Sequence, residues 1–330
     1  MARILVTGAS GFVGAHVARR LAAEGHDVRA TGRDAGRLQA LGNAMDTQVA
    51  DLAHDDLRAL LVDRDVVVHC AALSAPWGRP EDFHRANVEA TTRLLAIARA
   101  GGLRRFIHLG SPSIYFRFRD QLDLGETFSP PHRWITAYAQ SKWLSEERVR
   151  EAAANGLPAL VLRPRAVYGE GDRAILPRLL AVASRGWFPL VNQGRALIDV
   201  THIDNLVGLI AQCIDADVPG DGRAYNVSDG APVRVRDLLE MLFQALERDV
   251  RLVPLPRAPM LALAGLAEWR ARLTPGCPEP RLSRYGLGVI GYSQTLDIGR
   301  ARRELHYQPQ GDLRAGLERY ARWWRTHDLA

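Results

Sequence analysis

Hydrophobic positions in the first thirty residues follow a strand-like and then a helix-like spacing. The apolar run RILVTG ends in glycine, and after it Val13, Val17 and Leu21 recur at intervals of four residues. Gly25 stands where such a helix would end, and DVRATG resumes an extended pattern. The pattern predicts a strand, a glycine turn, a helix and a second strand.

The same alternation continues through the first half of the chain. Apolar, strand-like runs occur in DVVVHCAA, RRFIHLGS and PALVLRP, and helical patterns occur in ANVEATTRLLAIARAGG and AYAQSKWLSEERVREAAANG. Strands that alternate with helices of this length are typical of βαβ units. The expected fold class is therefore α/β, with a doubly wound parallel sheet of the Rossmann type.

After Tyr168 the alternation is interrupted by frequent proline and glycine. The later helical segment HIDNLVGLIAQCIDA and the strand-like RAYNVSDG are compatible with a return to the sheet. We expect a dinucleotide-binding domain over residues 1–170 and about 200–228. A smaller C-terminal substrate-binding domain is expected to take residues 171–199 and 229–330.

Composition narrows the class of protein only a little. The 330 residues are 47% hydrophobic and 24% charged, as in an ordinary soluble globular protein. The formal charge of +6 comes from arginines spread along the chain, so no nucleic-acid partner is expected. Three cysteines without a CxxC motif favour a reducing compartment, and no histidine spacing supports a metal site. Without a signal peptide or a membrane-spanning run, a cytoplasmic location is expected.

The turn TGASGFVG carries the first candidate chemistry. Gly8 permits a tight turn, Gly11 allows the backbone to approach a pyrophosphate, and Gly14 allows close contact between helix and strand. A phosphate would then lie at the helix N-terminus, where free N–H groups and the helix dipole favour negative charge. Because a strand precedes the turn and a helix follows it, the motif predicts a dinucleotide site rather than an ordinary tight turn.

Cofactor preference is expected to depend on the end of the second strand. A site for NAD places an acid there against the ribose 2′-hydroxyl, whereas this chain has Gly32 and Arg33 in ATGRD. A guanidinium suits a 2′-phosphate, so NADP(H) is predicted. NAD(H) stays the alternative, because Asp34 follows directly and Arg33 would also suit a solvated loop.

Lys142, in the stretch AYAQSKW, is the only lysine of the chain, and the other 42 of its 43 lysine and arginine residues are arginine. It follows Tyr138 by four positions in a helical pattern, which places both side chains on one face. A phenol needs a nearby positive charge to exchange protons near neutral pH. A compact ammonium can supply that charge and can pass a proton onward, which a guanidinium cannot. We therefore expect an acid/base pair.

A third group is expected at the end of the strand in IHLGSPSIY. Ser111 and Ser113 are both placed to hydrogen-bond a carbonyl oxygen and to stabilise the charge that develops on it. Serines at strand ends also serve simply as loop formers, so this assignment depends on the other motifs.

Five motifs in this order resemble the extended short-chain dehydrogenase/reductase family over nearly the whole chain: TGASGFVG, HCAA, SPSIY, YAQSK and LRPRAVYGEGD. The resemblance implies a serine, tyrosine and lysine triad. Within GSPSIY the family pattern places the serine on Ser111, with Ser113 as the alternative, and it makes Tyr138 the acid/base and Lys142 its partner.

The resemblance also implies a set of residues that contact the cofactor. Asp51 and Leu52 match the adenine contact, Ala71 and Ala72 line the cofactor, and the segment 164–167 faces the nicotinamide. The full expected set is Gly8, Ser10, Gly11, Phe12, Val13, Gly14, Arg33, Asp51, Leu52, Ala71, Ala72, Tyr138, Lys142, Pro164 and Val167.

Within the family the sequence is similar to the 3β-hydroxysteroid dehydrogenase branch, with ARRELHYQP as the recognisable C-terminal motif. It looks most like the NADPH-dependent 2-alkyl-3-oxoalkanoate reductases of bacterial olefin biosynthesis. The resemblance implies reduction of a 3-oxo group on a large lipophilic substrate, with a 3β-hydroxysteroid-like substrate next in order.

Two other functions stay open. An NAD-dependent sugar-nucleotide epimerase or dehydratase is disfavoured, because the Thr-Asp-Glu run usual in dehydratases is missing and Ala166 replaces the asparagine usual in epimerases. A non-catalytic NADP-sensing regulator is disfavoured by the retained tyrosine and lysine. The apolar stretch PMLALAGLAEW, residues 259–269, is interpreted as a lid, a packed helix face or a peripheral membrane contact. A homodimer is expected, since relatives often form one.

Overall fold

The computed structural model describes residues 1–42, 44–215 and 217–327. Its centre is a seven-stranded sheet with the strand order β12-β7-β5-β4-β1-β2-β3, in which every neighbouring pair is parallel. The strands are β1 (Arg3–Thr7), β2 (Asp27–Gly32), β3 (Asp46–Val49), β4 (Val66–His69), β5 (Arg105–Leu109), β7 (Ala159–Pro164) and β12 (Asp221–Val227). The predicted doubly wound parallel sheet is confirmed, and the late strand-like segment does return to it beside β7.

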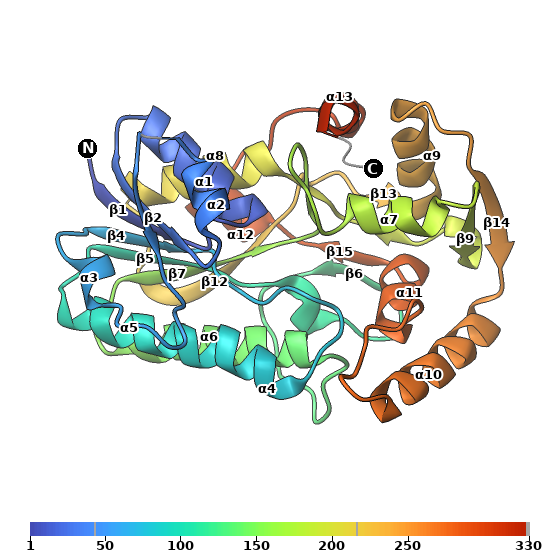
Figure 1. Ribbon diagram of the computed structural model, residues 1–330, viewed down its shortest axis with the longest axis horizontal. Coiled ribbons are helices and arrows are strands. Elements are labelled where there is room, and N and C mark those ends of the chain that lie inside the picture. Colours follow the sequence, from blue (N-terminus) through green and yellow to red (C-terminus); the bar gives the residue numbers. More distant parts are fainter. Residues whose placement is uncertain (43, 216, 328–330) are drawn as a thin grey trace.

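Helices cover both faces of this sheet (Figure 1). One face carries α1 (Phe12–Ala23), α8 (Ile203–Asp215) and α12 (Gly299–Glu304). The other carries α3 (Arg58–Leu61), α5 (Ala90–Ala100) and α6 (Ala137–Ala154). Three shorter elements complete this part: α2 (Ala35–Gln39), α4 (Pro80–Phe83) and the π-helix η1 (His84–Glu89), which leads directly into α5.

The alternation of side chains along the strands explains these two layers. Ile4 and Val6 point into the core beneath α1 and α8, whereas Leu5 between them points into the core beneath α5 and α6. All three are fully buried. Because successive strand residues face opposite sides, a strand covered on both faces is apolar throughout, which is the pattern of RILVT.

A second, smaller group of sheets lies beyond the carboxyl edge of the large one. A four-stranded mixed sheet has the order β13-β10-β15-β6, and two parallel pairs are formed by β11 with β8 and by β14 with β9. Its strands are β6 (Gln121–Leu124), β8 (Val167–Tyr168), β9 (Trp187–Val191), β10 (Leu197–Ile198), β11 (Thr201–His202), β13 (Val233–Arg234), β14 (Arg251–Leu255) and β15 (Gln294–Leu296). Its helical elements are η2 (Pro112–Tyr115), α7 (Leu176–Ala183), η3 (Asn192–Gly194), α9 (Val235–Ala245), α10 (Arg257–Leu273), α11 (Arg284–Gly291) and α13 (Leu313–His327). The division of the chain into two domains at the expected boundaries stays a prediction.

Helix α10 contains the apolar stretch noted in the sequence. Its small residue Ala264 is buried in a cluster with Leu287 of α11. On another face of the helix, Leu263, Leu266 and Trp269 are each more than half exposed. The packed-face interpretation therefore accounts for only part of this helix. No helix among the residues that the structure describes is long and apolar enough to cross a membrane.

Candidate active site

The glycine turn lies at the carboxyl end of β1, beside the end of β4, where the order of strands in the sheet reverses direction. Gly8 has a φ of +69°, and a Cβ there would lie 2.7 Å from the backbone nitrogen of Ala71. A Cβ on Gly14 would lie 2.3 Å from the carbonyl oxygen of Gly8. The turn therefore excludes side chains at both positions, and such a crevice is where dinucleotides bind in this class of sheet.

Helix α1 begins directly after this turn with its first N–H groups open. Gly11 is the N-cap residue and provides no side chain to accept their hydrogen bonds. Ser10 precedes it, and Phe12 and Val13 form the first turn of the helix. An anionic group placed there would meet both free donors and the positive end of the helix dipole. The residues present thus fit a dinucleotide pyrophosphate.

The ends of β2 and β3 bring three charged groups into one region. Gly32 packs so closely that a Cβ would lie 2.4 Å from Oγ of Ser10. Asp34 is the N-cap of α2, where its carboxylate accepts a hydrogen bond from the backbone N–H of Arg37 at 3.0 Å and lies 3.2 Å from Nε of the same arginine. Arg33 is exposed and interacts electrostatically with Asp51, which follows β3. Asp34 is therefore engaged locally, and Arg33 is available to an external anion.

The remaining expected cofactor contacts lie along the same edge of the sheet. Leu52 is buried and Ala72 is exposed. The backbone N–H of Ala71 donates to Oγ1 of Thr7 at 3.2 Å, which fixes the end of β4 against β1. Pro164 is the last residue of β7, and Val167 is the first of β8. Their predicted roles as cofactor contacts stay predictions.

Ser111 and Tyr138 come together although they lie on different elements. Ser111 follows β5, and Tyr138 is in the first turn of α6, whose N-cap Thr136 accepts from the backbone of Ala139 at 3.0 Å. The side chains of Ser111 and Tyr138 are hydrogen-bonded. Oγ of Ser111 also lies 2.9 Å from Oγ of Ser113, to which it donates. Ser111 is thus the serine bonded to the phenol, with Ser113 behind it.

A further partner of Tyr138 was not predicted from the sequence. Ser74, an exposed residue of the loop after β4, is also hydrogen-bonded to the phenol. Its segment, LSAPWG, has no regular pattern and so gave no indication of this contact. The phenol is therefore held between loops that follow two neighbouring strands, β4 and β5.

The pKa of Tyr138 differs from the sequence-based expectation. We expected Lys142 to lower it, but burial raises it, and the hydrogen bonds to Ser111 and Ser74 offset only part of this effect. The negative charge of Glu146 raises it further. A phenol with a raised pKa is protonated at neutral pH, which makes Tyr138 a proton donor in this state.

Lys142 lies one turn further along α6 and is 3% exposed. Its Nζ donates to the carbonyl oxygen of Leu109 at 2.5 Å, so the ammonium is tied to the end of β5. Burial lowers the pKa of Lys142 to about 8, against the opposing effect of the Glu146 charge. Two buried histidines, His69 and His108, both feel its positive charge. The lysine is therefore an interior group that changes protonation near physiological pH.

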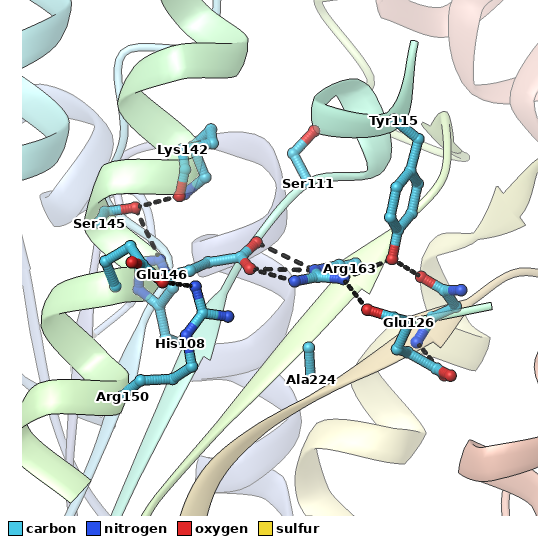
Figure 2. A network of polar contacts seen from close by, with 12 residues as sticks. His108, Ser111, Tyr115, Glu126, Lys142, Ser145, Glu146, Arg150, Arg163 and Ala224 are labelled. Carbon is cyan, nitrogen blue, oxygen red and sulfur yellow. Dashed lines mark hydrogen bonds and ion pairs between the residues drawn. The ribbon is translucent and has the colours of Figure 1, made fainter. Parts of the chain in front are cut away.

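A buried ion pair fixes α6 to the sheet (Figure 2). Glu146, four residues after Lys142, accepts from Nη2 of Arg163 at 2.6 Å and from Nε of Arg163 at 3.0 Å. Neither side chain is more than 1% exposed. Arg163 also contacts the hydroxyl of Tyr115, which donates to Oδ1 of Asn226 at 2.9 Å. The network joins α6, β7, β12 and the segment after Ser111, so it positions the elements that carry the site.

The family model described as the NAD dependent epimerase/dehydratase family matches residues 4–228. Among curated relatives, the uncharacterized protein YbjS of Escherichia coli is 35% identical over 98% of both chains. A 4-hydroxy-2-methyl-3-oxo-4-farnesyl-3,4-dihydroquinoline-1-oxide ketoreductase of Stigmatella aurantiaca is 33% identical, over 96% of this chain and 95% of that protein. A 2-alkyl-3-oxoalkanoate reductase of Stenotrophomonas maltophilia is 32% identical, over 96% and 98%.

Solved structures agree on the fold. The UDP-glucuronic acid 4-epimerase of Bacillus cereus, determined in complex with NAD, superposes with a TM-score of 0.77 over 98% of both chains at 22% identity. At this identity the similarity concerns the fold alone.

Proposed function

The chain belongs to the NAD dependent epimerase/dehydratase family, the extended short-chain dehydrogenases/reductases, and we propose that it is an NADPH-dependent reductase. Its proposed substrate is a large lipophilic molecule whose 3-oxo group is interconverted with a secondary alcohol. The observation that carries this proposal is the partly buried phenol of Tyr138, bonded to Ser111 and one helical turn from Lys142, the only lysine of the chain.

The proposed roles follow from the environment of each side chain. When bound, NADPH supplies the hydride that adds to the carbonyl carbon. Tyr138 gives its proton to the carbonyl oxygen, which suits a phenol that burial keeps protonated. Ser111, bonded to the same phenol, orients that oxygen and stabilises the charge that develops on it. Lys142, with a pKa of about 8, restores the proton to the site.

The preference for NADPH over NADH rests on the end of β2. Arg33 is exposed and Asp34 is held by the first turn of α2, so we expect Arg33 to be the charged group that meets the 2′ position of a bound cofactor. A guanidinium in this place suits a 2′-phosphate.

The substrate class is inferred from relatives and from the absence of sugar-nucleotide motifs. Two relatives with about one-third identity are a ketoreductase of a farnesyl-bearing dihydroquinoline oxide and a 2-alkyl-3-oxoalkanoate reductase. Ala166 stands where UDP-hexose epimerases usually have asparagine. These observations favour a 2-alkyl-3-oxoalkanoate first and a 3-oxosteroid second.

The test is a substrate panel with both cofactors. The purified chain is mixed with NADPH or NADH and offered a 2-alkyl-3-oxo acid, a 3-oxosteroid or a UDP-hexose while nicotinamide absorbance is followed. We expect stoichiometric oxidation of NADPH with the oxo acid. Turnover of the UDP-hexose without net change in absorbance would instead identify an epimerase, and tight NADPH binding with no turnover of any substrate would identify a sensor.

A further inference from the structure

Arg165 is held firmly just beyond the carboxyl end of β7. Its backbone N–H donates to the carbonyl oxygen of Val227 at 3.0 Å, and its carbonyl oxygen accepts from Oγ1 of Thr201 at 2.6 Å. The side chain is only 6% exposed. The backbone on both sides is thus fixed, and the long side chain extends into the interior at the edge of the sheet where the site lies.

The guanidinium of Arg165 has no hydrogen-bond partner or ion pair among the residues that the structure describes, and its Nε is fully buried. Arg163, two residues earlier, is equally buried but is bonded to both carboxylate oxygens of Glu146. The acid that acts electrostatically on Arg165 is Asp199, and its carboxylate is already bonded to the backbone N–H of Leu296 at 2.6 Å. A buried cation without a partner is unfavourable unless something supplies one.

The surroundings place Arg165 on the substrate side of the site. Tyr285, in the first turn of α11, feels the charges of both Arg165 and Tyr138. Its ring lies edge-on to Phe116, 5.2 Å away, in the segment that follows Ser111. Arg165 therefore shares a region with the reactive phenol.

Arg165 is also remote from the cofactor phosphates. Strand β7 is three strands from β1 in the sheet, which is roughly 14 Å at about 4.8 Å per strand. The glycine turn that fits a pyrophosphate lies at the end of β1. An anion that reaches Arg165 is therefore expected to belong to the substrate.

We propose that Arg165 binds a carboxylate of the substrate, so that the site selects 3-oxo acids over their esters and over uncharged 3-oxosteroids. This inference rests on the proposed function and names the charge of its substrate. A guanidinium offers two parallel N–H donors to a carboxylate, which gives orientation as well as affinity. Binding of the acid would place the 3-oxo carbon at a fixed distance from the guanidinium, beside Tyr138.

The first experiment compares a 2-alkyl-3-oxo acid with its methyl ester in wild type, Arg165→Met and Arg165→Lys. Arg165→Met is expected to lower kcat/KM for the acid roughly 100-fold, as expected for loss of a charge-assisted hydrogen bond, and to leave the ester within about threefold. Arg165→Lys is expected to recover part of the activity on the acid. The matched control is Arg117→Gln, because Arg117 lies in the same region but its Nη1 already donates to the carbonyl oxygen of Phe116 at 2.7 Å. An equal loss for acid and ester in Arg165→Met would overturn the proposal.

The second experiment needs no turnover, so it separates this inference from the proposed function. Calorimetry of wild type with NADP⁺ measures binding of the 2-alkyl-3-hydroxy acid and of its methyl ester. We expect the acid to bind roughly 30-fold more tightly in wild type and equally to the ester in Arg165→Met. Equal binding of acid and ester to wild type would refute the proposal whether or not the variants fold. Loss of NADPH binding in Arg165→Met would also refute it, by assigning Arg165 to the cofactor.

Discussion

The buried ion pair between Glu146 and Arg163 makes a quantitative test of how the site is held. Glu146→Gln keeps the shape of the side chain but removes the charge that faces Arg163, whose side chain is 1% exposed. Removing one partner of such a pair leaves an uncompensated buried charge and costs about 3–5 kcal/mol in the free energy of unfolding. For a chain of 330 residues that corresponds to a fall in Tm of roughly 4–7 °C.

The same substitution is expected to reduce activity without touching the reacting groups. Tyr138, Lys142 and Glu146 follow one another at intervals of four residues on α6, so the ion pair with β7 sets the position of the phenol. A small displacement of an acid/base group lowers the rate strongly, and we expect kcat to fall roughly tenfold with KM nearly unchanged.

Urea unfolding followed by circular dichroism, together with steady-state kinetics, measures both effects. The matched control is Glu151→Gln on the same helix, because Glu151 forms an exposed ion pair with Arg148 at 2.7 Å and its loss should cost less than about 1 kcal/mol. The double variant Glu146→Leu with Arg163→Met should regain most of the lost stability, since it removes both buried charges. A cost for Glu146→Gln no larger than that for Glu151→Gln would refute this account of the network.

Three further predictions concern the lysine and the cofactor. Because burial lowers the pKa of Lys142 to about 8, the rate of ketone reduction by wild type should fall as pH rises through that value. The variant Lys142→Arg should be slower than wild type at neutral pH but should lack this decline, because a guanidinium stays protonated. The pKa of Lys142 in the folded protein lies below its ordinary value of 10.5, so between about pH 8 and 10.5 the folded protein binds fewer protons than the unfolded chain. The free energy of unfolding should therefore rise with pH across this window. Urea titrations at several pH values measure this increase, and Lys142→Met should abolish it. Arg33→Ala should lower kcat/KM for NADPH by roughly 10- to 100-fold and leave kcat/KM for NADH nearly unchanged. An equal loss of kcat/KM with both cofactors would exclude the proposed contact between Arg33 and the 2′-phosphate.

The sequence was most informative where the relevant interactions are local. The glycine turn, the helix after it and the i, i+4 relation of Tyr138 and Lys142 all depend on residues near one another in the chain, and the structure has them as predicted. The parallel sheet followed from apolar runs alone, because strands covered on both faces are apolar throughout.

What could not be predicted depends on contacts between distant segments. Glu146 pairs with Arg163, 17 residues away, and nothing in either segment distinguishes this arginine from Arg165. The raised pKa of Tyr138 was missed because spacing indicates a neighbouring lysine but not the burial that outweighs it. The domain boundaries, the homodimer and the cytoplasmic location stay predictions.

The most direct test of the proposed chemistry is a single-turnover experiment with Tyr138→Phe. Enzyme saturated with NADPH is mixed with a 2-alkyl-3-oxo acid, and nicotinamide absorbance is followed in wild type and in the variant, with cofactor binding measured separately by fluorescence. The account predicts that Tyr138→Phe binds NADPH as wild type does but oxidises it at least about 100-fold more slowly, because the carbonyl oxygen has lost its proton donor. Oxidation at the wild-type rate in Tyr138→Phe would contradict it.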